Sequence, residues 1–202
     1  MTMPPLPQWR MLGSQTMPAA IRPLDEVLDL LLDTFRKDGY DGASLAQLSK
    51  ITGLGKSSLY HYFPRGKEEM LAKVLRHLEA RLERDLFAPM RETGSPRAKL
   101  NAMLDVIDAF YEGGNRACLL ERACASVDRA RFRKPLQHVF ASWIGALEGL
   151  CLEAGVERGK ARARAEDVVA RIEGALILCA ALQNTAPFAR ALQQIRDSLL
   201  AA

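Results

Sequence analysis

Residues 44–63 constrain the fold of this chain more than any other segment, because they predict two short helices joined by a tight turn. Ser44 is a favourable N-cap for a first helix over residues 45–51. Gly53 follows that helix, and glycine accepts the positive φ that a sharp reversal between packed helices requires. A second short helix is predicted over residues 56–62. This arrangement is typical of a helix-turn-helix unit.

The second helix carries side chains that suit a DNA groove. Lys56 adds a charge to a helix N-terminus whose free N–H groups already attract phosphate. Ser57 and Ser58 are short, so the backbone can approach base edges closely. Tyr60 and His61 lie one turn later, within reach of flanking phosphates. Ser44, the cap of the preceding helix, and Lys67, at the start of the following helix, are also expected to reach phosphates. The predicted DNA-contacting residues are therefore Ser44, Lys56, Ser57, Ser58, Tyr60, His61 and Lys67.

Charge is distributed unevenly along the chain. Residues 42–67 contain no Asp or Glu but four basic residues, Lys50, Lys56, Arg65 and Lys67. That local charge of +4 equals the net charge of all 202 residues, which by itself permits an anionic partner without requiring one. The alternative interpretation is a chance cluster of basic residues on a solvated face.

Helical periodicity continues along the rest of the chain, and we expect an all-α protein of about nine helices without a stable strand. A first helix is predicted over residues 23–37, and the helices after the short pair are predicted over residues 67–87, 96–111, 116–127, 132–154, 160–184 and 187–200. The proline-rich residues 1–20 are predicted to form a disordered arm. The expected domains are then a DNA-binding unit (21–66), a connecting helix (67–88) and a C-terminal helical domain (89–202).

Other functional classes receive little support from the sequence. The four cysteines, at 118, 124, 151 and 179, lack metal-ligand spacing, so we expect free thiols, a reducing cytoplasm, and neither metal nor cofactor. Sensing of oxidants by Cys118 or Cys124 stays an open alternative. The three histidines are isolated and no paired carboxylates stand out, which disfavours an enzyme. The longest uncharged stretch, residues 174–189, is too short to span a membrane.

Specific motifs in residues 27–74 resemble the N-terminal domain of TetR/AcrR-family transcriptional regulators. Residues 35–40, Phe-Arg-Lys-Asp-Gly-Tyr, match the family's aromatic-x-x-x-Gly-Tyr pattern. Residues 53–63 match its Gly-Val-Ser-Lys-Gly-Ser/Thr-Leu-Tyr-His-Tyr-Phe signature, with Gly55 where serine is common and Ser57 where glycine is common. Residues 63–68, Phe-Pro-Arg-Gly-Lys-Glu, resemble the form found in the LmrA/YxaF-like subgroup.

The resemblance implies a homodimeric repressor that binds a palindromic double-stranded DNA operator. A small molecule entering the C-terminal domain would release the DNA. By the same resemblance, the residues that map onto DNA-contacting positions are Lys56, Ser57, Ser58, Tyr60, His61 and Lys67. Two alternatives remain: an architectural DNA-binding protein with the same head and no effector, and a helical enzyme.

A dimer is also expected from the residues themselves. Residues 174–182 are apolar on all sides of the predicted helix, whereas a surface helix is apolar on one side only. Together with the last helix they could build a four-helix interface across a two-fold axis. The alternative is a central core helix of a single chain. The predicted interface residues are Leu176, Cys179, Leu182, Phe188, Leu192 and Ile195.

A ligand pocket is predicted between helices of the C-terminal domain. Aromatic and methionine side chains on these helices suit a small hydrophobic effector, although ordinary core packing explains each of them as well. The predicted lining residues are Met103, Ile107, Phe110, Tyr111, Phe140, Trp143 and Leu147.

Overall fold

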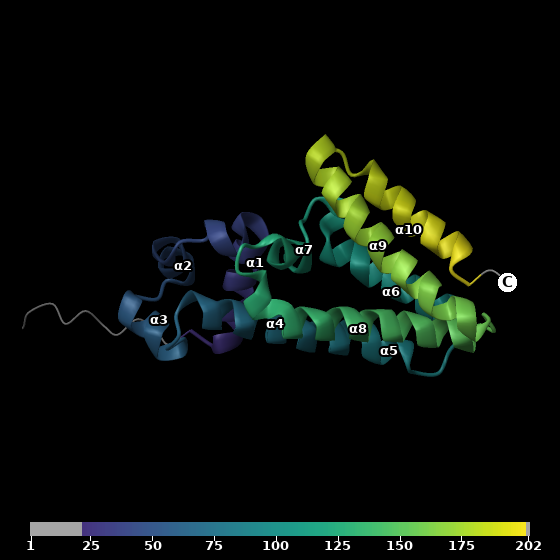
Figure 1. Ribbon diagram of the computed structural model, residues 1–202, viewed down its shortest axis with the longest axis horizontal. Helices are drawn as coiled ribbons and strands as arrows, with labels where there is room; N and C mark the ends of the chain where they lie inside the picture. The colour runs from purple at the N-terminus through teal and green to yellow at the C-terminus, as the bar shows by residue number, and fades with distance from the viewer. Residues whose placement is uncertain (1–21, 201–202) are drawn as a thin grey trace, which may run out of the picture.

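A computed structural model describes residues 22–200 of the chain, and these residues form helices and no strand. The expected arm over residues 1–20 lies outside them. The helices of the N-terminal part are α1 (Leu24–Gly42), α2 (Leu45–Thr52) and α3 (Lys56–Tyr62). In Figure 1, α2 and α3 lie at one end of the molecule, away from α9 and α10.

One continuous helical rod leads out of this head. It begins as α4 (Lys67–Leu82), passes through a π-helical turn, η1 (Glu83–Phe87), and ends as α5 (Ala88–Met90). It runs beside α8 in Figure 1 and so joins the head to the rest of the molecule. Residues 67–88 were predicted to be this connecting helix.

The C-terminal part is a helical bundle in which α8 packs on α9 and α9 packs on α10. If α4, η1 and α5 are taken as one helix, the described α-helices number nine. The elements of the bundle are α6 (Pro96–Phe110), η2 (Glu112–Gly114), α7 (Leu119–Ala125), α8 (Arg129–Glu153), α9 (Arg158–Leu182) and α10 (Ala186–Ser198).

The first helix extends beyond its predicted end. Asp38-Gly39 was expected to stop it, and Gly39 does interrupt the helical geometry with φ 71° and ψ 173°. Helical structure resumes after this kink because the Ala43 N–H bonds to the Gly39 carbonyl at 3.3 Å. The extra turn places the Tyr40 ring edge-on to Phe132 of α8, with ring centroids 5.1 Å apart.

Most of the predicted dimer residues lie in the core of their own chain. Leu176, Cys179, Phe188, Leu192 and Ile195 are each at most 5% exposed. Phe188, for example, packs on Tyr111 with ring centroids 5.9 Å apart. These five side chains cannot be presented to a second subunit, so their assignment to an interface is corrected.

The outward face of α9 lies elsewhere on the helix. Leu182 is 62% exposed, and its exposed apolar neighbours are Ile177 and Leu178, each 51% exposed. Because residues 174–182 of α9 are apolar on all sides, the sequence could not indicate which side of this stretch would meet the chain's own core.

Candidate nucleic-acid interface and ligand cavity

The α3 helix stands out from the head with its polar side chains exposed. Lys56, Ser57, Ser58 and His61 are all exposed, and the Tyr60 side chain is 41% exposed. On the opposite side, Leu59 and Phe63 anchor the helix in the core, at 2% and 0% exposure. Helical spacing thus sends the apolar residues inward and leaves a face of hydroxyl and cationic groups free for a partner.

Local hydrogen bonds hold the turn between α2 and α3. Gly53 adopts the left-handed conformation, with φ 69° and ψ 7°. The Ser49 hydroxyl donates to the Leu54 carbonyl at 2.6 Å, and the Thr52 hydroxyl donates to the Leu48 carbonyl at 2.7 Å. The predicted role of the turn residues was conformational, and these two hydroxyls were missed although Ser and Thr are common in such local bonds.

Ser44 caps α2, as its position in the sequence indicated. Its hydroxyl oxygen accepts a hydrogen bond from the Gln47 N–H at 3.2 Å. The side chain remains exposed. The cap therefore orients the N-terminus of α2 toward solvent, where its free N–H groups can meet a phosphate.

Lys67 has an internal partner that the sequence did not reveal. Its ammonium donates to the Ala43 carbonyl at 3.0 Å and lies 4.5 Å from the centroid of the Tyr40 ring. The side chain is half-buried. Lys67 therefore holds the start of α4 against the α1–α2 turn, and the exposed cations among residues 42–67 are Lys50, Lys56 and Arg65.

A second lysine of α4 holds the far end of α3. The Lys73 ammonium donates to the Tyr62 carbonyl at 2.7 Å and pairs with Glu69 at 3.2 Å. This bond satisfies one of the carbonyls that the last turn of a helix leaves free. Through Lys67 and Lys73, α4 contacts both ends of the α2–α3 unit.

A small cavity of about 50 Å³ lies between the head and the bundle. Four of the seven predicted pocket residues line it: Ile107, Phe110, Tyr111 and Trp143. The other three lie elsewhere. Met103 and Leu147 are core residues that do not line it, and Phe140 lines a separate open groove along α8.

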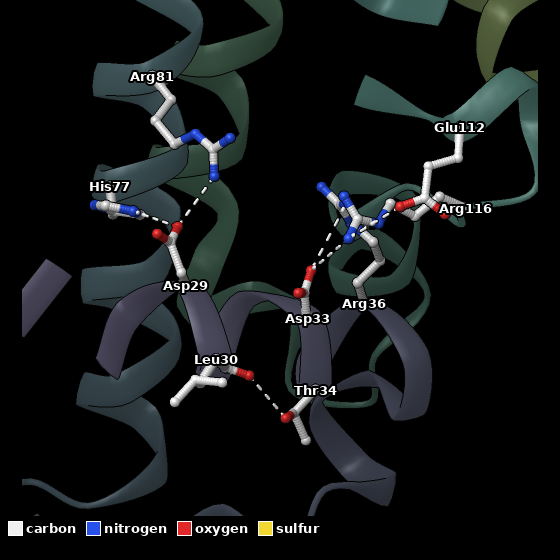
Figure 2. Close-up of polar contacts among 9 residues, drawn as sticks. All are labelled: Asp29, Leu30, Asp33, Thr34, Arg36, His77, Arg81, Glu112 and Arg116. Atoms are coloured by element: carbon white, nitrogen blue, oxygen red, sulfur yellow. Dashed lines mark hydrogen bonds and ion pairs between the residues drawn. The ribbon is translucent and has the colours of Figure 1, made fainter. Parts of the chain in front are cut away.

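The cavity wall also includes residues of α1 in the head and of the connecting helix α4, which the sequence did not place there. Arg36 of α1 and Leu78, Arg81 and Leu82 of α4 all contribute to it. Arg81 is already paired with Asp29 of α1 at 3.0 Å, and the same carboxylate contacts His77 at 2.9 Å (Figure 2). The cavity is therefore shared by the two parts of the molecule.

A buried polar chain runs beside the cavity. The Tyr111 hydroxyl donates to the Cys118 sulfur at 3.3 Å, and the Cys118 thiol donates to the Glu173 carboxylate at 3.2 Å. Burial raises the pKa of Cys118 far above its usual range, and the nearby Glu173 raises it further. Burial likewise raises the pKa of Glu173 to about 7. A thiol held in its protonated form is a poor nucleophile, which argues against redox sensing by Cys118.

The two parts of the chain match two models of one protein family. Residues 27–74 match the model for bacterial regulatory proteins of the tetR family. Residues 96–194 match the C-terminal domain of LmrA/YxaF-like transcriptional regulators. The chain belongs to the TetR family. It is a DNA-binding transcriptional regulator, and the subgroup suggested by residues 63–68 is confirmed.

Curated relatives extend over most of the chain. The HTH-type transcriptional regulator LmrA of Bacillus subtilis (strain 168) is 24% identical over 180 residues, covering 87% of this chain and 95% of LmrA. An uncharacterized HTH-type regulator in the lacX 3′ region of Lactococcus lactis subsp. lactis is 28% identical over 176 residues, covering 79% of this chain and 84% of the relative. These relatives are regulators and not enzymes, as expected for this TetR-family chain.

Solved structures share the fold. The crystal structure of a TetR transcriptional regulator from Legionella pneumophila superposes with a TM-score of 0.80 at 18% identity, covering 90% of this chain and 99% of the other. FadR of Bacillus subtilis, solved in complex with stearoyl-CoA, superposes with a TM-score of 0.69 at 13% identity, covering 89% and 98%. Within residues 22–200, no helix is long and apolar enough to cross a bilayer.

Proposed function

We propose that this TetR-family regulator is a homodimeric repressor that inserts α3 into the major groove of a palindromic operator and is released by a small molecule. The observation that carries the proposal is the division of α3 into a buried side and an exposed side. Leu59 forms the buried side, and the exposed side consists of Lys56, Ser57, Ser58, Tyr60 and His61. An exposed helix free of acidic side chains is attracted to the phosphate backbone and can reach base edges.

The proposed contacts on DNA divide into two kinds. Ser57 and Ser58 face base edges, and Lys56, Tyr60 and His61 contact phosphates, with Ser44 at the start of α2 on the neighbouring backbone. Lys67 contributes by positioning α4 beneath the head, because its ammonium already bonds to Ala43.

The proposed dimer surface is the outward face of α9. Ile177, Leu178 and Leu182 expose a continuous set of apolar side chains there, and such a patch favours association. Two copies related by a two-fold axis would present two α3 helices to half-sites separated by about 34–36 Å, one turn of duplex.

The cavity beneath the head favours a regulator controlled by an effector over an architectural DNA-binding protein without one. Apolar side chains form most of its wall, and head residues from α1 and α4 take part in it. FadR, of the same fold, was solved with stearoyl-CoA, so this helical architecture can hold a small molecule. A ligand larger than a few atoms must enlarge the 50 Å³ cavity, and enlargement would displace the head helices that line it.

The DNA-binding proposal is tested by placing a negative charge on α3. Ser58→Glu is expected to abolish binding to the DNA upstream of the regulator's own gene, measured by fluorescence anisotropy, because the new carboxylate would face phosphates. Thr93→Glu, an exposed site on the loop after α5, adds the same charge and should bind like the unmodified protein. Equal affinity of Ser58→Glu and Thr93→Glu would reject α3 as the DNA-contacting helix.

A further inference from the structure

The Arg36 guanidinium is a buried cation without a hydrogen-bond partner. Its side chain is 4% exposed, and none of its three nitrogens has a partner among residues 22–200. The nearest carboxylate oxygen, on Asp33, lies 4.0 Å from Nη1, too far for a hydrogen bond. Asp33 is shared with Arg116, which lies 3.5 Å from the same oxygen and also contacts Glu112 (Figure 2).

The position of Arg36 directs it into the cavity. It lines the cavity, and its guanidinium carbon lies over the Phe110 ring at 4.5 Å from the centroid. The cavity wall also includes Trp143, whose indole N–H is buried without a hydrogen-bond partner in the described part of the chain. Burial and the nearby Arg116 lower the pKa of Arg36, so the charged guanidinium is disfavoured relative to its state in water.

The unsatisfied groups of the cavity wall are all donors. A guanidinium carries five N–H donors and no acceptor, and an indole N–H donates only. The other charged groups of the wall are occupied, since Arg81 pairs with Asp29 and Asp85 pairs with Arg84 at 2.7 Å. A buried cation with unmade hydrogen bonds destabilises the fold, and an anion with several acceptor lone pairs would offset that cost.

We infer that the cavity takes the carboxylate head of an amphipathic ligand, held by the Arg36 guanidinium and the Trp143 N–H. A planar carboxylate matches the two parallel N–H groups of a guanidinium. The apolar part of the ligand would lie against the rest of the wall, formed by Leu78, Leu82, Leu86, Ile107, Leu119 and Leu120. The inference rests on the effector-controlled function proposed above and names the effector's chemical class.

A ligand bound by Arg36 would contact the proposed DNA-binding head directly, because Arg36 is itself a residue of the head. Arg36 lies on α1, four residues before Tyr40. The Lys67 ammonium lies over the Tyr40 ring, 4.5 Å from its centroid. The α4 side of the cavity belongs to the same helix that holds α3 through Lys73. A ligand that draws Arg36 into new hydrogen bonds therefore acts on both helices that support α2 and α3.

The experiment compares carboxylates with their uncharged amides on the full-length protein. Melting temperatures are measured with millimolar acetate, benzoate or octanoate, and with acetamide, benzamide or octanamide. At least one carboxylate is expected to raise the melting temperature, by about 5–10 °C at roughly 100-fold excess over its dissociation constant, while its amide does not. Equal shifts for every acid–amide pair, or no shift from any carboxylate, would overturn the inference.

Variants test the assignment independently of the ligand series. Arg36→Met is expected to melt at the same or a higher temperature without ligand, because it removes a buried charge that makes no hydrogen bond, and to lose the shift caused by carboxylate. Trp143→Phe should reduce that shift. Arg81→Met removes a cation that is already paired and should keep the preference for acid over amide. An Arg36→Met protein that melts lower without ligand, or still prefers the acid, would reject the role of Arg36.

Anisotropy on operator DNA separates this inference from the proposed function. Carboxylate binding that leaves DNA affinity unchanged would retain the anion site and reject effector control. DNA binding by a protein that no carboxylate stabilises would retain the DNA-binding function and reject the anion site.

Discussion

At the scale of single residues, burial changes what familiar side chains do. Glu173 lies beside the Cys118 thiol with one carboxylate oxygen buried and without a partner. Burial disfavours its charged form and raises its pKa from 4.5 to about 7. The same environment keeps Cys118 protonated. Residues that look reactive in the sequence are here components of the core.

Glu173 should make the stability of the protein depend on pH. Its pKa of about 7 in the folded chain exceeds the ordinary 4.5, so the folded state binds the proton more tightly than the unfolded state does. The stabilisation is complete below the unfolded pKa and is lost as the pH rises through 7. Between pH 5 and pH 8 the free energy of unfolding should fall by roughly 2–3 kcal/mol more than in Glu173→Gln.

Urea unfolding at several pH values measures this difference. Glu166→Gln, which removes an exposed carboxylate from the same helix, should keep the pH dependence of the unmodified protein. If Glu173→Gln and the unmodified protein lose stability equally between pH 5 and pH 8, the carboxyl is not protonated in the folded state.

At the scale of elements, α4 is the support on which α2 and α3 are held. It contacts the start of α2 through the bond from Lys67 to Ala43 and the end of α3 through the bond from Lys73 to Tyr62. A helix of seven residues has little stability of its own, so α3 depends on such tertiary contacts. Movement of α4 would therefore change the position of α3 directly.

Removing the bond from Lys73 should loosen α3 while the bundle stays intact. Lys73→Met keeps the apolar stem against Phe63 but leaves the Tyr62 carbonyl without its donor. A charged hydrogen bond of this kind contributes about 1.5–3 kcal/mol, and partial exposure of Lys73 favours the lower end. Hydrogen exchange should speed up in α3, and DNA affinity should fall.

Lys50→Met is the matched control, because Lys50 is exposed on α2. It should leave exchange in α3 unchanged. Unaltered exchange in Lys73→Met would show that the lysine does not hold the helix end.

At the scale of the whole molecule, one apolar face is left uncovered by the chain itself. Ile177, Leu178 and Leu182 of α9 are between 51% and 62% exposed in the described part of the chain. The proposed dimer would cover this face and set the spacing between two α3 helices.

Charges on that face should separate the proposed subunits. The double substitution Ile177→Glu and Leu178→Glu is expected to halve the mass measured by light scattering from about twice 22.3 kDa to one chain. It should also weaken operator binding, because a monomer brings one α3 helix to the DNA and makes half the DNA contacts of a dimer. Val127→Glu, at an isolated side chain that is 84% exposed, should stay dimeric. A double variant that remains a dimer would place the interface elsewhere.

Local pattern sufficed for the elements and for the exposed side of α3. Three local features were decisive: the spacing of Leu59 and Phe63, the glycine at 53 and the cap at Ser44. Each acts between residues that are close in the chain, so its effect can be predicted from the neighbouring sequence. Local pattern did not suffice for the end of the first helix, which was predicted at residue 37 and lies at Gly42, beyond the kink at Gly39.

Tertiary packing decided what happens where distant segments meet. It decided which side of the apolar residues 174–182 of α9 faces the core, gave Lys67 an internal carbonyl as partner, and buried Arg36 and Glu173 without full partners among residues 22–200. Each of these outcomes depends on groups many residues away, whose positions are fixed only when the helices pack. The sequence by itself therefore determined a helical TetR-family regulator whose α3 exposes its polar side chains, and the packed structure determined which buried charges surround its cavity.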